Sequence, residues 1–137
     1  MKMIYISHPY SSDEQANKVK AHRLAAELAE AYPGIVFVNP LNAMSHTATA
    51  NLSYETIVEQ CVELMKRCDA VIMVDGWDMS VGCSREFYSA LAEGMIIYHG
   101  VAEFRHSMDS GGYQYCRRNY WTREENLKAR GTRYAPK

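Results

Sequence analysis

Short apolar runs alternate with longer amphipathic segments along the first hundred residues. Four of the runs are rich in β-branched or apolar residues and predict strands, at 2–7, 35–38, 69–75 and 95–99. Three other segments carry apolar residues at helical spacing and predict helices, at 13–31, from Ser53 to Cys68, and from about residue 83. This order predicts an α/β fold, a Rossmann-like, doubly wound parallel sheet of about four to five strands.

Polar residues separate these elements. Ser12 is expected to cap the first helix and Pro33-Gly34 to end it, while residues 39–52 lack periodicity and predict a long loop. In a doubly wound sheet, ligands bind beyond the carboxyl ends of the strands. We therefore expect one crevice where three loops converge, at 7–12, 39–46 and 75–82.

The pattern weakens after residue 100. Gly111-Gly112 predicts a turn, and residues 122–130 predict a short charged helix that Thr122 caps. The domain is thus expected at 1–100, followed by an irregular extension at 101–137 that packs on the domain or on a neighbouring subunit.

The charge of the chain is unevenly distributed. The 137 residues carry a formal net charge of −1. Residues 1–100 hold 7 Lys/Arg and 12 Asp/Glu, whereas residues 101–137 hold 8 and 4. The basic tail either is a solvated segment that lies against the acidic body, or contacts a phosphate or a neighbouring subunit. A nucleic-acid polymer is not an expected partner at this total charge.

Composition excludes several classes of protein. No apolar run approaches ~18 residues and the amino-terminal segment lacks the form of a secretory signal, so a cytoplasmic protein without a membrane span is expected. The four cysteines form no CxxC pair and no zinc-like cluster, which favours reduced thiols and no metal. The phosphate-binding motifs GxxxxGK[ST] and GxGxxG and the GxSxG elbow are absent, and no cofactor is expected.

One segment combines groups that could act on a sugar. Ser80-x-Gly82-x-x-x-Glu86 follows a predicted strand and opens a predicted helix, so Glu86 is expected in the first helical turn. Gly82 would let the backbone approach a ligand, and Ser80 would donate to an anion or a sugar hydroxyl. An ionised carboxylate facing an anomeric carbon suits an oxocarbenium-like transition state. The alternative is that Glu86 only interacts favourably with the helix dipole.

Together with two further segments, this block resembles the nucleoside 2-deoxyribosyltransferase-like superfamily, in particular its small bacterial and phage branches related to nucleotide N-glycosidases. The resemblance covers roughly residues 3–98 and depends on three segments, Ile4-Tyr5-Ile6-Ser7-His8-Pro9, Cys68-Asp69-Ala70-Val71 and Gly76-Trp77-x-x-Ser80-x-Gly82-x-x-x-Glu86-x-x-x-Ala90. It implies cleavage of an N-glycosidic bond, with Glu86 as the nucleophile and Tyr5 as the residue that positions it. In the superfamily's nucleotide-hydrolysing members the position of Ser80 is a serine that binds a 5′-phosphate, whereas deoxyribosyltransferases have an aspartate there.

Cys61 departs from the superfamily pattern. It stands where an aspartate usually helps to protonate the departing base, and a thiol is a poor general acid. A buried core role is the alternative for Cys61. Asp75, Asp78 or His46 could supply the proton instead, and the sequence does not select among them.

The remaining candidate residues lie in the three converging loops. Ser7, His8 and Pro9, in the loop that starts at the end of the first strand, are expected to bind the substrate, together with Gly76 and Asp78 of the third loop. Four candidates have structural alternatives. His8 either contacts a phosphate or a base or is merely exposed. Trp77 either stacks on a base or covers the edge of the core, Asn39 either binds sugar hydroxyls or forms a turn with Pro40, and Asp75 either lines the site or bonds to backbone amides.

These observations predict an enzyme that cleaves or transfers at the N-glycosidic bond of a nucleoside or nucleoside 5′-monophosphate. Whether water or a second base resolves the intermediate is left open. A non-catalytic protein that sequesters or senses a nucleotide is the main alternative, and a structural homo-oligomer is the third. The resemblance also implies a homo-oligomer, for which the Tyr- and Arg-rich stretch 113–121 is a candidate interface.

Overall fold

The structure is a computed structural model that describes residues 1–110 of the chain. The predicted features at 111–112, 113–121 and 122–130 lie outside the described residues. The elements follow in the order β1 (Lys2–Ser7), α1 (Glu14–Ala31), β2 (Ile35–Val38), α2 (Pro40–Ala43), η1 (Ser45–Ala48), α3 (Tyr54–Lys66), β3 (Ala70–Met73), η2 (Trp77–Met79), α4 (Val81–Glu93), β4 (Ile96–Tyr98) and α5 (Val101–Asp109).

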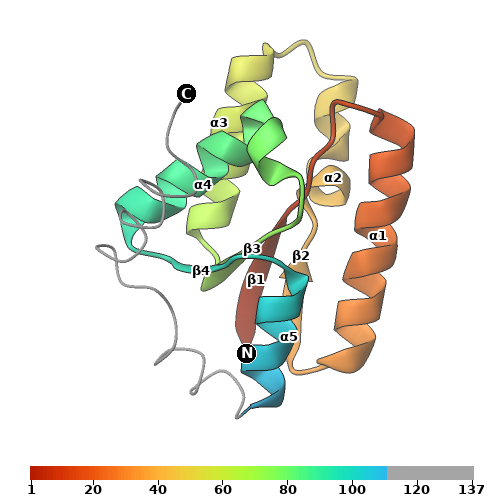
Figure 1. The fold of residues 1–137 in the computed structure, drawn as a ribbon. Coiled ribbons are helices and arrows are strands. Elements are labelled where there is room, and N and C mark those ends of the chain that lie inside the picture. Colours follow the sequence, from red (N-terminus) through yellow and green to blue (C-terminus); the bar gives the residue numbers. More distant parts are fainter. Residues whose placement is uncertain (111–137) are drawn as a thin grey trace.

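The four strands form one parallel sheet in the order β2-β1-β3-β4 (Figure 1). Strand β1 is central, and its Tyr5 pairs with Val38 of β2 on one side and with Val71 of β3 on the other. The chain moves from β1 to β2, then crosses back to β3 on the opposite side. This reversal places the switch point between β1 and β3, which confirms the predicted doubly wound sheet.

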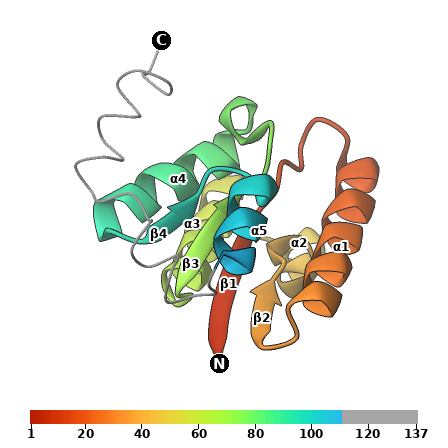
Figure 2. The ribbon, with the colours of Figure 1, turned by 60° about the horizontal axis from the view of Figure 1, so that its bottom comes forward.

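Helices cover both faces of the sheet, so alternate strand residues enter two separate cores (Figures 1 and 2). Tyr5 and Val71 face α3 and α4, where they pack with Phe87. Ile4 and Ile72 face α1 and α5. Strand β3 is buried on both faces and wholly apolar, and β1 is buried from Ile4 to Ser7, with Lys2 and Ser7 as its polar residues.

Several predicted boundaries are wrong by one or two residues. Asp13, not Ser12, caps α1, because its carboxylate is the group that accepts from the amide of Ala16, at 3.2 Å. Helix α4 begins at Val81 instead of at residue 83, because the Ser80 hydroxyl caps it. Ser53 caps α3 as predicted.

Two helical segments occur where the pattern predicts none. The long loop expected at 39–52 contains α2, which the side chain of Asn39 caps, and η1, which begins after Met44 without a side-chain cap. Helix α5 follows β4 directly, and its Phe104 is fully buried. The Phe104 ring makes edge-to-face contacts with Tyr32, Phe37 and Tyr98. Residues 101–109 therefore belong to the core of the domain.

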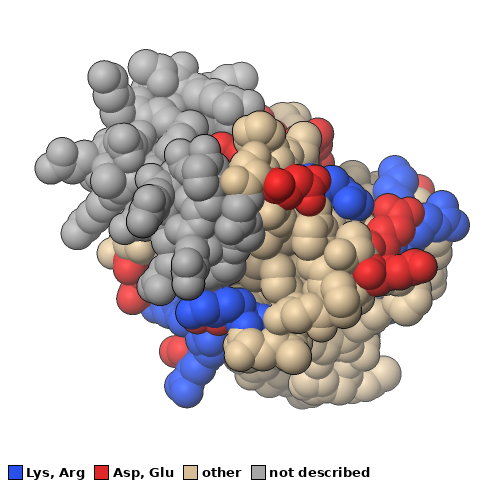
Figure 3. All heavy atoms as spheres, turned by 90° about the horizontal axis from the view of Figure 1, so that it is seen from below, with Lys and Arg blue, Asp and Glu red and all other residues tan. Residues whose placement is uncertain are grey.

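Charged side chains of both signs are interspersed on the face shown in Figure 3. Within the described residues, no helix combines the length and the apolar character that crossing a membrane requires.

Candidate functional site

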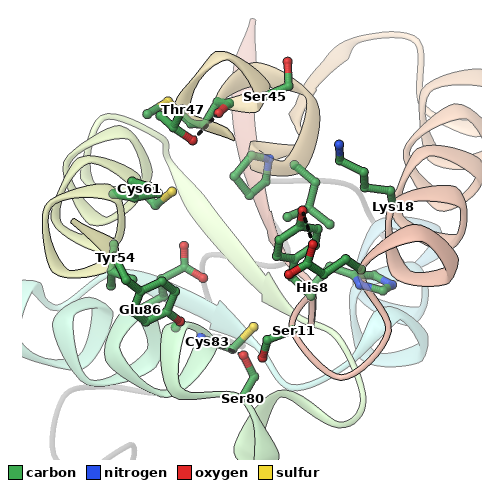
Figure 4. A pocket seen from close by; sticks show the side chains of 18 of the residues that line it. His8, Ser11, Lys18, Ser45, Thr47, Tyr54, Cys61, Ser80, Cys83 and Glu86 are labelled. Atoms are coloured by element: carbon green, nitrogen blue, oxygen red, sulfur yellow. Dashed lines mark hydrogen bonds between the residues drawn. The ribbon is translucent and has the colours of Figure 1, made fainter. Parts of the chain in front are cut away.

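A cavity of about 370 Å³ lies at the carboxyl ends of the strands, as predicted for a doubly wound sheet (Figure 4). Its wall combines the loop after β1, the first two turns of α1, segments α2 and η1, helix α3 and the start of α4. Twenty residues line it: Tyr5, His8, Tyr10, Ser11, Glu14, Lys18, Pro40, Leu41, Met44, Ser45, Thr47, Ala48, Tyr54, Ile57, Val58, Cys61, Ser80, Gly82, Cys83 and Glu86.

Glu86 is the buried carboxyl group of this cavity. It lies on the face of α4 that packs on the sheet, and only 6% of the residue is exposed. The Tyr5 hydroxyl donates to Oε2 of Glu86, and the Ser7 hydroxyl donates to Oε1 at 2.8 Å. Tyr5 and Ser7 are two residues apart on β1 and so point to the same face of the sheet. The strand therefore holds both oxygens of the carboxyl group.

Burial dominates the ionisation of Glu86. Removal of the carboxyl group from water raises its pKa from 4.5 to about 7, although the hydrogen bonds from Tyr5 and Ser7 lower it. The expectation that Glu86 lies in the first helical turn is wrong, since α4 begins at Val81 and its first turn contains no acidic residue. The helix dipole is therefore not what controls this carboxyl group.

Two thiols lie beside the carboxyl group. Cys61 on α3 and Cys83 on α4 both line the cavity, and burial followed by the charge of Glu86 raises the pKa of each to about 11. Both thiols are therefore protonated at neutral pH. Cys61 is not simply a core residue, because its side chain is half-buried and faces the cavity.

The start of α4 forms one end of the cavity. The Ser80 hydroxyl accepts a hydrogen bond from the amide of Cys83 at 3.3 Å, and Ser11 of the loop after β1 also lines the cavity (Figure 4). A Cβ atom at Gly82 would lie 3.3 Å from the hydroxyl of Tyr54. Gly82 thus permits the close approach of Tyr54, a side chain of the chain itself.

The structure brings five predicted site residues to the cavity wall, and they are Tyr5, His8, Ser80, Gly82 and Glu86. Ser7 contacts the cavity indirectly, through Glu86. Six others do not line it, namely Pro9, Asn39, Asp75, Gly76, Trp77 and Asp78.

Structural roles account for three of these six. Trp77 is 6% exposed and stacks on Phe87 with ring centroids 4.4 Å apart, so it covers the core instead of facing the cavity. Asn39 caps α2, since its Oδ1 accepts from the amide of Leu41 at 3.2 Å. Gly76 adopts a positive φ of 91°, which favours glycine at the turn before η2.

The alternative proton donors considered for the departing base lie elsewhere. Asp75 and Asp78 are exposed, and neither lines the cavity. His46 in η1 is also exposed, although its neighbours Ser45 and Thr47 are lining residues. The structure therefore brings none of the three to the wall beside Glu86.

Sequence reasoning missed seven lining residues with polar side chains and one with a thiol: Tyr10, Ser11, Glu14, Lys18, Ser45, Thr47, Tyr54 and Cys83. Three of them, Ser11, Lys18 and Tyr54, show what signal the sequence carried. Ser11 belongs to a loop that was expected to form the crevice, so its position carried a signal. Lys18 lies one turn beyond Glu14, and Tyr54 is the first residue of α3. Both are near the amino-terminal ends of helices, which lie at the same edge as the carboxyl ends of parallel strands. That rule could have found them.

The hydroxyl of Tyr54 is close to the buried groups. Its pKa is raised, first by partial burial and then by the nearby Cys83 and Glu86. The residue as a whole is 56% exposed, so its ring lies at the mouth of the cavity. Tyr54 can therefore contact a ligand and also limit the access of water to Glu86.

Within residues 1–110, no group of three or more His, Cys, Asp or Glu side chains is arranged to hold a metal ion. No curated protein and no solved structure matches the chain. A family model does match, over residues 2–99, and this range contains the whole sheet and every residue that lines the cavity. The chain belongs to the family described as "Domain of unknown function (DUF4406)".

Proposed function

We propose that the protein cleaves or transfers at the N-glycosidic bond of a nucleoside or nucleoside 5′-monophosphate. The observation that carries the proposal is the buried carboxyl group of Glu86, which Tyr5 and Ser7 hold at the wall of the cavity. A residue with a purely structural role has little reason to bury a carboxyl group, because its ionised form is costly to desolvate.

The reaction would proceed through a covalent intermediate. A carboxylate oxygen of Glu86 forms a bond to the anomeric carbon, the bond from that carbon to the base nitrogen breaks, and its electron pair remains on the base. The base then takes a proton. Water, or the nitrogen of a second base, attacks the anomeric carbon and releases the carboxylate. Tyr5 and Ser7 would keep the carboxyl group in one orientation throughout.

The opposite end of a substrate would lie at the start of α4. Ser80 and Ser11 present neutral hydroxyls there, and such groups can donate to a 5′-phosphate or a 5′-hydroxyl without like-charge repulsion. The volume of about 370 Å³ falls within the range of small-molecule sites.

The test is incubation with a panel of nucleosides and 5′-monophosphates, with release of the base followed by chromatography. Glu86→Gln is expected to abolish release, because the amide is not nucleophilic. Glu93→Gln is the matched control, since Glu93 lies on the same helix but is exposed and pairs with Lys66. Release that persists in Glu86→Gln would contradict the proposed role of the carboxyl group.

A second candidate is a protein that binds a nucleotide without turning it over. The observation that favours it is Cys61, whose thiol faces the cavity with its pKa raised to about 11 and so is a weak proton donor to a departing base. Binding of a nucleotide by the wild type without any release of base would support this second function. Assembly as a homo-oligomer and a cytoplasmic location stay predictions.

A further inference from the structure

Lys18 is the cationic side chain of the cavity. Among the described residues that line the cavity, it is the only Lys or Arg, and it reaches the cavity from α1, across from Glu86 (Figure 4). The side chain is half-buried. We propose that Lys18 binds the departing base and stabilises the negative charge that develops on it. This inference rests on the proposed function.

Two carboxyl groups, of Glu14 and Glu86, line the same cavity as Lys18, but neither forms a direct ion pair with it. Lys18 takes part in none of the ion pairs formed among residues 1–110. Glu14 precedes it by one helical turn, but the Glu14 carboxylate accepts a hydrogen bond from the Tyr10 hydroxyl at 3.4 Å instead. A half-buried lysine side chain without an ion-pair partner among residues 1–110 is suited to an anionic or electron-rich ligand group.

The position of Lys18 assigns it to the base and not to the sugar. The start of α4, with Ser80, forms one end of the cavity, and Glu86 lies between that end and η1 (Figure 4). Near η1, the cavity wall contributed by α2, α3 and the residue between α2 and η1 is apolar, whereas η1 itself adds the hydroxyls of Ser45 and Thr47. The apolar lining residues there are Pro40, Leu41, Met44, Ala48, Ile57 and Val58. A flat heterocyclic base fits such a surface, and Lys18 supplies the polar group that would orient it.

The chemistry requires a group with this property. When the glycosidic bond breaks, the electron pair remains on the base nitrogen, and an acid or a cation must stabilise it. Cys61 is an ineffective acid, since burial raises its pKa to about 11. A fixed positive charge in a site of low dielectric lowers the energy of the departing anion without transferring a proton. The base then takes its proton from water.

The experiment compares the rate of base release by Lys18→Met, Lys18→Arg and wild type. Lys20→Met is the matched control, because Lys20 is on the same helix but exposed and outside the cavity. Lys18→Met is expected to lower kcat by about 100-fold with an unmodified base. Lys18→Arg should recover much of the loss, and Lys20→Met should match wild type. Circular dichroism of each variant checks that it is folded, and Lys18→Gln serves as a second uncharged variant.

The decisive measurement is the dependence on the leaving base. An N7-methylated purine departs as a neutral molecule, and a 5-fluorinated pyrimidine departs as a weaker base, so each needs less stabilisation. The loss caused by Lys18→Met should therefore be much smaller with the activated base of whichever class the wild type cleaves. A structural defect would slow both bases equally, and that result would overturn the role of Lys18.

Two other results would also overturn it, and they differ in what they imply. A loss seen only with 5′-monophosphates, and not with nucleosides, would place Lys18 at a phosphate and leave the proposed function standing. Absence of base release by the wild type from every compound would overturn the proposed function and this inference together.

Discussion

The clearest physical consequence of the structure concerns the stability of the fold and not its activity. Glu86 is buried, and its pKa is raised from 4.5 to about 7. The folded chain therefore binds a proton at this carboxyl group more tightly than the unfolded chain does. By linkage, its contribution to stability is fully present below pH 4.5 and is lost as the pH rises through 7. The change Glu86→Gln removes this titration.

The magnitude follows from the size of the shift. A difference of one pKa unit between the folded and unfolded states is worth about 1.4 kcal/mol, so the shift at Glu86 corresponds to about 3 kcal/mol. Glutamine has nearly the same shape and carries no charge at any pH. The free energy of unfolding of Glu86→Gln should therefore gain about 3 kcal/mol relative to wild type between pH 4.5 and pH 8.

Urea denaturation followed by circular dichroism at a series of pH values measures this difference. Other titrating groups are common to both proteins and cancel in the comparison. Glu93→Gln, on the exposed part of the same helix, should not show the same rise. If the curves of wild type and Glu86→Gln ran parallel from pH 4.5 to pH 8, burial would not control the carboxyl group and the reasoning would be refuted.

Four further changes test individual contacts. Tyr5→Phe removes a hydrogen bond that lowers the pKa of Glu86, so the pKa should rise above 7 and activity at pH 7 should fall, as a pH–rate profile would record. Cys61→Asp places a second carboxyl group in the same cavity, and like-charge repulsion should likewise move the pH–rate profile to higher pH. Trp77→Phe should lower the urea midpoint but leave KM unchanged, because Trp77 packs on the core. A raised KM would instead support the predicted contact of Trp77 with the base. Phe104→Ala should lower the free energy of unfolding by about 3 to 5 kcal/mol in urea denaturation, whereas a negligible loss would show that α5 is not part of the core.

The sequence predicted the sheet well because its strands are buried. Each strand lies inside its predicted run, since β-branched and apolar residues leave little choice between strand and surface. Helix α5 was not predicted, because Phe104 and Met108 stand among polar residues and give too little periodicity. Its place is determined by the aromatic side chains that surround Phe104, which come from distant parts of the chain.

In the candidate site, too, some residues could be predicted from the sequence and others could not. The contact of Glu86 with Tyr5 was predicted from a family resemblance, which implied that this tyrosine positions the glutamate. For Trp77 the sequence left two alternatives open, because it cannot show that the chain turns at Gly76 and directs the indole towards Phe87; the structure places the indole against the core. The omission of Lys18 has the opposite cause. It lies on a side of α1 that the apolar pattern marks only as polar, and only the tertiary arrangement shows that this side faces a cavity.

The charges around Glu86 also explain why a thiol suits position 61. The pKa of Glu86 is already about 7, so any further rise would leave little of the ionised nucleophile at neutral pH. An aspartate at position 61 would compete with Glu86 for ionisation, because two neighbouring carboxylates repel each other. One of the two groups would keep its proton while the other ionises. A protonated thiol adds no charge. If Lys18 stabilises the base from the opposite side of the cavity, no second acid is needed at position 61. The thiol of Cys61 and the charge of Lys18, which forms no ion pair within residues 1–110, then belong to one arrangement. The double change Cys61→Asp with Lys18→Met tests this: an aspartate that supplies the missing acid should recover part of the rate lost in Lys18→Met, and no recovery at any pH would separate the two positions.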